Sequence, residues 1–164
     1  NEVMYRDDLT EEQLLDYIRR VKAAVPDIPV GYVDAYYEFE DRPAITEMCD
    51  VILANCYPFW EGCSIEYSLL YMKDMYRRTE KVAAGKKIII TETGWPNKGQ
   101  TFYGAVPSQE NAIRYFLNTQ HWAQTDEIDI FYFSSFDESW KVGAEGDVGA
   151  YWGLWDKDEK LKYV

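Results

Sequence analysis

Two acidic residues of the sequence stand where strands are expected to end. The segment IIITETGWP (88–96) passes from three isoleucines to the carboxylate of Glu92, and Glu2 stands near the start of the chain. Taken singly, Glu92 is equally well explained as a capping or salt-bridging residue, and Glu2 as a solvated one. As a pair at the ends of strands, they suggest a proton donor and a carboxylate that attacks or directs water, which is the chemistry of glycosidic bond cleavage.

Other chemistries find little support in the sequence. The single histidine, His121, lies within a helical pattern, which disfavours a Ser-His-Asp or Cys-His pair and a histidine-based metal site. Cys49, Cys56 and Cys63 are spaced C-x6-C-x6-C, which is not a zinc spacing. Buried free thiols are the preferred interpretation, and one disulfide with a remaining thiol is the alternative. We predict neither a metal nor a cofactor.

Composition limits the partners of the chain. Its net charge of −12 disfavours nucleic acid and anionic membrane surfaces, since both require basic patches. No run of 18 apolar residues occurs, so no membrane span is predicted. Aromatic residues make up 16% of the sequence, with 14 Tyr and 6 Trp, and flat apolar faces with polar edges suit sugar rings.

Two kinds of segment alternate along the chain. Runs rich in β-branched and aromatic residues predict strands at 28–33, 50–59, 86–93 and 127–136. Helical periodicity predicts helices at 10–25, 64–84 and 108–125, with a shorter one near 42–48. Thr10 and Gln13 form a capping-box pattern, and Gly85 is a natural helix stop. The alternation predicts an α/β fold with a parallel sheet.

The spacing of strand ends fits a (β/α)8 TIM barrel. The ends fall near residues 2, 34, 57, 92 and 136, and eight βα units in ~250 residues average about 31 residues each. A doubly wound sheet fits the spacing equally well. However, polar and aromatic side chains gather at the expected C-terminal strand ends, as in barrel enzymes. The sequence also lacks a glycine-rich phosphate loop, which counts against a nucleotide-binding sheet.

Five motifs carry a family resemblance. IIITETGWPNKG (88–99) closely resembles the signature of glycoside hydrolase family 17, which comprises β-1,3-glucanases and related glucanosyltransferases. NEV (1–3) resembles the tail of that family's GNE motif at the fourth barrel strand. Three further segments match in order: ANCYPFW (54–60), YFSSFDESWK (132–141) and YWGLWDKDEKLKY (151–163). The resemblance covers essentially the whole chain.

The resemblance implies a single catalytic-barrel segment, 1–164, running from the end of strand four through strand and helix eight, with the N-terminal half absent. Glu92 is then the nucleophile and Glu2 the acid/base. Retention of configuration requires carboxyl groups about 5–5.5 Å apart.

The resemblance also implies a substrate-binding set. Asn1 would hold the 2-hydroxyl of the sugar, and Asn55 with Tyr57 would line the same subsite. Glu138 and Lys141 would complete its polar floor. Phe59 and Trp60 would form an aromatic platform, and Trp95 and Trp140 would each either stack on a sugar or plug the barrel mouth.

We therefore expect a retaining β-glucan hydrolase that cleaves β-1,3-glucosidic bonds through a covalent glycosyl-enzyme intermediate. A β-1,3-glucanosyltransferase using the same site and an inactive, glucan-binding half-barrel are the alternatives. The expected partner is a β-glucan oligo- or polysaccharide, and a half-barrel would need its missing N-terminal half or self-association because its strand edges are open. By resemblance, the expected location is extracellular, periplasmic or cell-wall associated.

Overall fold

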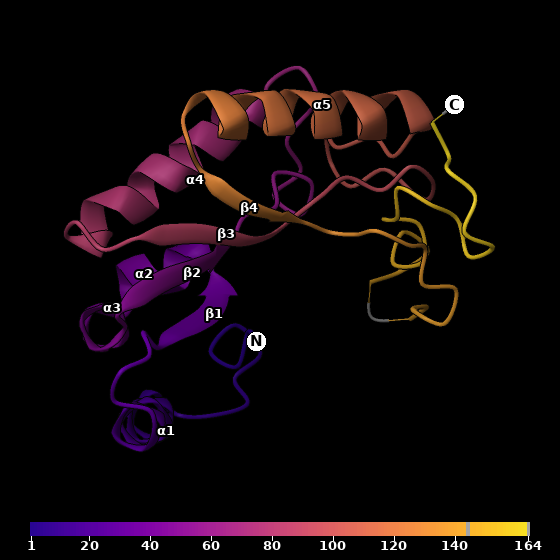
Figure 1. The fold of residues 1–164 in the computed structure, drawn as a ribbon. Coiled ribbons are helices and arrows are strands. Elements are labelled where there is room, and N and C mark those ends of the chain that lie inside the picture. Colours follow the sequence, from indigo (N-terminus) through magenta and orange to yellow (C-terminus); the bar gives the residue numbers. More distant parts are fainter. Residues whose placement is uncertain (144, 164) are drawn as a thin grey trace. The chain divides into compact units, whose positions relative to one another are not determined.

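The computed structural model describes residues 1–143 and 145–163, and these form two compact units. The first comprises Asn1–Cys56 and Lys73–Thr91, and the second comprises Tyr57–Met72 and Glu92–Val164. Helices and strands alternate along the chain, as the ribbon in Figure 1 shows. The predicted α/β fold with a parallel sheet is confirmed.

Four short strands, β1 (Gly31–Ala35), β2 (Val51–Asn55), β3 (Ile88–Thr93) and β4 (Asp129–Tyr132), pair in the order β1-β2-β3-β4. Strands β1 and β2 are parallel, with Ala35 opposite Asn55. Parallel strands end at the same edge, so the side chains that follow β1 and β2 are brought to one side of the first unit. Strand β3 continues from the first unit into the second, where Phe133 donates to the carbonyl of Thr93 at 2.8 Å.

The helices of the first unit bury apolar side chains. Helix α1 (Glu11–Ala24) begins with the predicted capping box between Thr10 and Gln13 and buries Leu14 and Ile18. Helix α3 (Pro43–Met48) confirms the short helix predicted at 42–48, with Pro43 in its first turn.

Helix α2 (Tyr36–Asp41) was not predicted from the sequence. It has six residues and no side-chain cap, so its local signal is weak. It forms because Tyr36 and Phe39 are buried against the unit, where Phe39 lies 6.2 Å from the ring of Tyr32. Tertiary packing, and not the helix propensity of its residues, therefore stabilises α2.

Helix α4 (Ser68–Ala83) is shorter than the predicted 64–84. The helix begins four residues later than predicted because residues 64–67 form a turn, in which the N–H of Tyr67 donates to the carbonyl of Ser64. Its end agrees with the glycine signal: Ala84 and Gly85 both have left-handed φ angles, of 52° and 81°.

Aromatic side chains form the core of the second unit. Helix α5 (Gln109–Thr125), capped by Ser108, buries Tyr115 and Trp122. The core cluster combines Phe59, Ile65, Trp95, Ala105, Ala112, Tyr115, Val148 and Trp152. Phe59, Trp95, Tyr115 and Trp152 are the aromatic members of this core.

Two predicted strands end earlier than expected. The strand predicted at 50–59 stops at Asn55, because Pro58 has no N–H and a turn follows in which Gly62 donates to the carbonyl of Phe59 at 2.9 Å. The strand predicted at 127–136 covers only Asp129–Tyr132, since the backbone beyond it bonds to the segment around Trp152 and Trp155.

A partly buried ion pair holds the C-terminal segment. Lys162 Nζ donates to Asp137 Oδ1 at 2.7 Å and to Asn97 Oδ1 at 3.0 Å. Both charged side chains are only 10% exposed, and burial lowers the pKa of Lys162. The pair ties the last described residues to the loop that follows β4.

All three cysteines are free thiols, as the preferred interpretation of their spacing states. Cys49 and Cys56 are buried and Cys63 is partly exposed; burial raises the pKa of Cys49 and Cys63. Within the described residues, no helix is both long enough and apolar enough to span a bilayer.

Candidate active site

Glu2 lies in a tight turn of the first unit, formed by residues 2–8. Its backbone N–H donates to the carbonyl of Val33 at 2.9 Å, and its own carbonyl accepts from Arg6 at 3.0 Å. Its φ is +59°, a left-handed conformation that costs a non-glycine residue on the order of 1–3 kcal/mol and persists only when neighbouring contacts impose it. The turn therefore holds this acid in a specified place.

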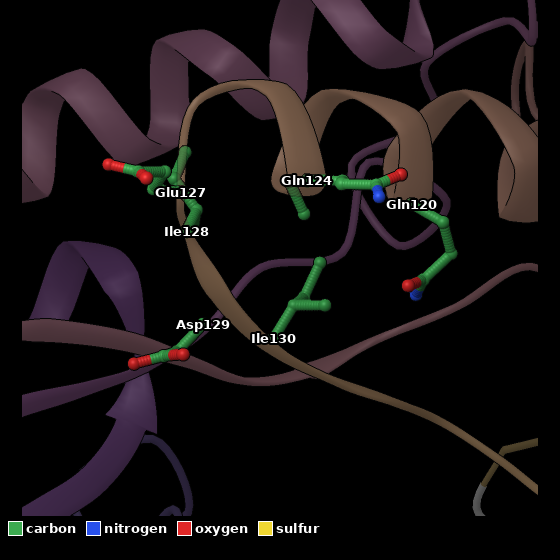
Figure 2. Close-up of a pocket in the computed structure, with 7 residues that line it drawn as sticks. Gln120, Gln124, Glu127, Ile128, Asp129 and Ile130 are labelled. Atoms are coloured by element: carbon green, nitrogen blue, oxygen red, sulfur yellow. The ribbon is translucent and has the colours of Figure 1, made fainter.

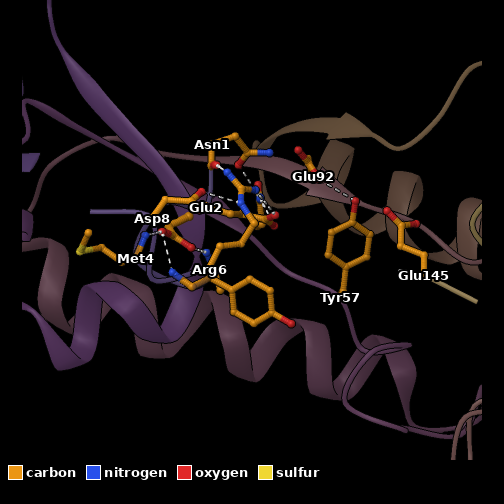
Figure 3. A network of polar contacts seen from close by, with 12 residues as sticks. Asn1, Glu2, Met4, Arg6, Asp8, Tyr57, Glu92 and Glu145 are labelled. Carbon is orange, nitrogen blue, oxygen red and sulfur yellow. Dashed lines mark hydrogen bonds and ion pairs between the residues drawn. The ribbon is translucent and has the colours of Figure 1, made fainter. Parts of the chain in front are cut away.

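A basic residue, Arg6, lies against the Glu2 side chain. Arg6 Nη1 lies 3.5 Å from Glu2 Oε2, and Arg6 Nε donates to Asp8 at 2.9 Å. The Arg6 guanidinium also donates to the carbonyl of Asn1, as the dashed lines in Figure 3 show. Arg6 thus connects Asn1, which precedes the turn, to Asp8 at the end of the turn.

Asn55, at the end of β2, contacts Glu2 directly. Its amide nitrogen donates to Glu2 Oε1 at 2.9 Å and to Asn1 Oδ1 at 3.1 Å. Its amide oxygen accepts from the hydroxyl of Thr91 at 2.8 Å. With only 3% of its surface exposed and both ends of its amide engaged, Asn55 orients Glu2 through a fixed donor. The structure thus brings together Asn1, Glu2 and Asn55 in the first unit.

Glu92, in the second unit, is half-buried near the C-terminal end of β3. The hydroxyl of Tyr57 donates to Glu92 Oε2 at 2.9 Å, which Figure 3 marks with a dashed line. Gly94 follows two residues later, and a side chain there would clash, because a Cβ would lie 2.0 Å from the carbonyl oxygen of Phe133. This close approach accounts for the glycine in the ETGWP motif.

Glu138 and Lys141, the expected polar floor, form an ion pair 3.7 Å apart in the second unit. Lys141 also pairs with Glu145 at 3.0 Å, and its Nζ lies 4.4 Å from the ring centre of Phe133. The lysine charge is therefore shared between two carboxylates and an aromatic face.

The aromatic candidates divide into core and surface. Phe59 and Trp95 are 0% and 1% exposed, and the Trp95 indole donates to the carbonyl of Val106 at 3.0 Å. Both rings are core residues of the second unit, and this burial disfavours the stacking role expected for them. Trp60 is half-buried, whereas Trp140 is 73% exposed and offers an accessible ring.

Sequence reasoning missed three residues that contact the candidates. Thr91 contacts Asn55, and Arg6 contacts Glu2. The i,i+4 spacing of Arg6 from Glu2 is a sequence signal from which the Arg6 contact could have been predicted. Trp152 packs edge-on against Tyr57, with ring centres 5.5 Å apart, and lies at the centre of the aromatic cluster. Its buried indole N–H has no hydrogen-bond partner among the described residues.

Neither of two surface hollows contains a candidate catalytic acid. One, of about 460 Å³, lies between the end of α5 and the start of β4 and is lined by Gln120, Gln124, Glu127 and Asp129 among others, as Figure 2 shows. The other, of about 430 Å³, lies beside the turn after Glu2 and is lined by residues including Asp8 and Arg42. Among residues 1–143 and 145–163, no cluster of three or more His, Cys, Asp and Glu side chains could hold a metal ion.

The sequence matches a defined family of sugar-cleaving enzymes. The family model described as the BtgE/BtgC glycoside hydrolase domain matches residues 1–153, and the chain belongs to this family. The predicted kinship with glycoside hydrolase family 17 is confirmed by its solved relatives, which are TIM-barrel enzymes.

Particular relatives make the comparison more specific. A family 17 β-1,3-glucanosyltransferase from Rhizomucor miehei is 33% identical with a TM-score of 0.90, over 99% of this chain and 59% of that one. A glucan 1,3-β-glucosidase of Arthroderma benhamiae is 31% identical over 99% of this chain and 58% of its own length. A cell surface mannoprotein of Candida albicans is 27% identical over 94% and 42%. The chain thus spans about three fifths or less of these relatives.

Proposed function

We propose that this chain supplies both catalytic carboxylates of a retaining enzyme that acts on β-1,3-glucan. The observation that carries the proposal is the placement of Glu92 at the end of β3, with the Tyr57 hydroxyl bonded to one carboxylate oxygen. That bond orients the carboxylate of the proposed nucleophile. The similarity to glucan 1,3-β-glucosidases and to a β-1,3-glucanosyltransferase supports the substrate class.

The proposed reaction has two steps. In the first, Glu92 attacks the anomeric carbon while Glu2 gives its proton to the departing glycosidic oxygen, so a glycosyl ester forms on Glu92 as the bond between sugars breaks. In the second, the Glu2 carboxylate takes a proton from water, the water oxygen attacks the same carbon, and Glu92 is released. Two inversions give net retention.

The remaining candidates are proposed to bind the sugar at the cleavage point. Asn1 donates to the 2-hydroxyl, and Asn55 holds Glu2 at the same subsite. Glu138 and Lys141 supply the polar floor through their ion pair. Trp140, which is 73% exposed, and the half-buried Trp60 offer aromatic faces to glucose rings.

Transfer is the second candidate function. If the hydroxyl of a second glucan takes the place of water, the same intermediate gives a longer chain instead of a shorter one. The similarity to the Rhizomucor miehei glucanosyltransferase favours this alternative. Because polymeric glucan lies outside the cytoplasm, and one relative is a cell surface protein, we propose an extracellular or cell-wall location.

The function is tested with β-1,3-linked glucose oligosaccharides. The natural protein that contains this chain is expected to convert them, and chromatography will show shorter products alone for a hydrolase or additional longer products for a transferase. Oligosaccharides with β-1,4 linkages serve as the matched control and should remain unchanged. A natural protein that leaves the β-1,3 series intact would contradict the proposal.

Replacing Tyr57 by Phe tests the contact that carries the proposal. The change removes only the hydroxyl that donates to Glu92. Since the lost bond goes to a charged group, worth about 1.5–3 kcal/mol, we expect kcat to fall about 10- to 100-fold with an unchanged melting temperature. Tyr67→Phe, at a ring 66% exposed in the same unit, is the control. Equal kinetics for both variants would remove Tyr57 from the mechanism.

A further inference from the structure

One buried carboxylate fastens the Glu2 turn to the first unit. Asp34, in β1, is 0% exposed. Its Oδ2 accepts from the backbone N–H of Met4 at 3.1 Å and of Tyr5 at 3.4 Å, while its Oδ1 accepts from the N–H of Ala35 at 2.7 Å. The two carboxylate oxygens therefore connect the strand to the turn.

A tyrosine hydroxyl completes this cluster. Tyr32 is 7% exposed, and its hydroxyl donates to Asp34 Oδ2 and accepts from the N–H of Met4 at 3.0 Å. Burial, followed by the bond to Asp34, raises the pKa of Tyr32, so the phenol stays protonated and remains a donor. Met4 itself is 3% exposed, which buries the cluster beneath the turn.

The physical role of the cluster follows from the cost of burying charge. A carboxylate removed from water is stable only when donors replace its hydration, and here two of the donors, the N–H groups of Met4 and Tyr5, belong to the turn itself. The strand also takes the N–H of Glu2 through the carbonyl of Val33, the residue before Asp34. Together these bonds impose the left-handed φ of Glu2 and set where its carboxyl group points.

We propose that Asp34 is a positioning residue for Glu2: its carboxylate holds residues 4 and 5 so that the Glu2 carboxyl group stays in register for proton transfer. This rests on the proposed function, in which Glu2 is the acid/base. Asp34 is buried beneath the turn and acts only through backbone bonds. Loss of the Asp34 carboxylate is therefore expected to slow only the reaction steps in which Glu2 gives or takes a proton.

The test compares two substrates in the natural protein carrying Asp34→Asn. With a β-1,3-glucan oligosaccharide, whose leaving group needs a proton, kcat is expected to fall about 10- to 100-fold, the loss caused by a displacement of about 1 Å. With an activated aryl β-laminaribioside and azide, neither step needs proton transfer, so the rate should fall no more than about threefold. Equal losses on both substrates would overturn the proposal.

Two further variants make the test sharp. Tyr32→Phe keeps the carboxylate but removes one donor, and it should show the same substrate dependence with a smaller loss; equal losses on both substrates would again overturn the proposal, even if Asp34→Asn folds poorly. Asp50→Asn is the matched control, because Asp50 likewise accepts a backbone N–H, from Val30 at 3.0 Å, but this contact lies just before the start of β1, away from the Glu2 turn. Its kinetics should equal those of the unchanged protein.

The Glu2→Gln variant distinguishes a failure of the positioning role of Asp34 from a failure of the acid/base role of Glu2. If Glu2→Gln shows the substrate dependence and Asp34→Asn does not, only the positioning role fails. If Glu2→Gln lacks it, the acid/base assignment fails and the positioning role with it. If both hold, adding Asp34→Asn to Glu2→Gln should change the oligosaccharide rate by less than about twofold, because the two changes disable one function.

Discussion

Replacing Glu92 by Gln is expected to lower kcat/KM for a β-1,3-glucan oligosaccharide by roughly 10⁴-fold or more, the size of effect that follows removal of a covalent nucleophile. Glutamine keeps the shape and can still accept the Tyr57 hydroxyl bond. It cannot form the glycosyl ester, because a neutral amide oxygen is a poor nucleophile. The measurement is the initial rate of product release by the natural protein.

Glu80→Gln is the matched control for this change. Glu80 is an exposed acid on α4, so the same substitution there should leave kcat/KM unchanged and the melting temperature close to that of the starting protein. A Glu92→Gln variant that retained substantial turnover while folding normally would contradict the nucleophile assignment.

Glu2→Gln is expected to lower kcat for the same oligosaccharide by about 10²- to 10⁴-fold, which is the usual contribution of a general acid–base group. The defect should depend on the leaving group. An activated aryl β-laminaribioside departs without a proton, so the first step survives and the glycosyl-enzyme accumulates. Azide attacks that intermediate without a general base, and it should restore turnover and yield a β-glycosyl azide.

Glu12→Gln, at an exposed acid in the first turn of α1, is the control for Glu2→Gln and should behave like the unchanged protein. Azide that failed to accelerate the Glu2→Gln variant, or an azide product of α configuration, would argue against Glu2 as the acid/base of a retaining reaction.

Helix and strand ends that depend on a few neighbouring residues could be predicted from the sequence. The capping box of Thr10 and Gln13 sets the start of α1, and the left-handed stop at Gly85 follows the end of α4. The end of the strand that presents Glu92 was also predicted, because a buried apolar run stops there and polar residues follow, whereas the strand that ends at Asn55 was expected to run to residue 59. At these positions a few consecutive residues determine the backbone conformation.

Features set by tertiary packing were not predictable. Helix α2 forms because Tyr36 and Phe39 are buried, not because its residues favour a helix. Trp95 stands beside the candidate nucleophile in the sequence, yet its ring points into the aromatic core and donates to Val106. Burial of a given ring depends on neighbours distant in sequence, so spacing alone could not separate it from the exposed Trp140.

The positioning contacts of the candidate acids are likewise long-range. Thr91 reaches Asn55 across 36 residues, and Asp34 reaches the backbone of Met4 across 30. Such bonds leave no periodic trace in a sequence. They become visible only when the strands have been placed beside one another.

Trapping the glycosyl-enzyme tests most directly whether Glu92 is the nucleophile. A fluorinated β-1,3-glucan analogue with an activated leaving group should form a slowly hydrolysed ester, and trypsin should release it on the peptide 88–98, IIITETGWPNK, in which Glu92 is the only carboxyl side chain. Mass spectrometry of that peptide is expected to show the mass of the added sugar on Glu92. A label on any other peptide, or products of inverted configuration, would contradict the account.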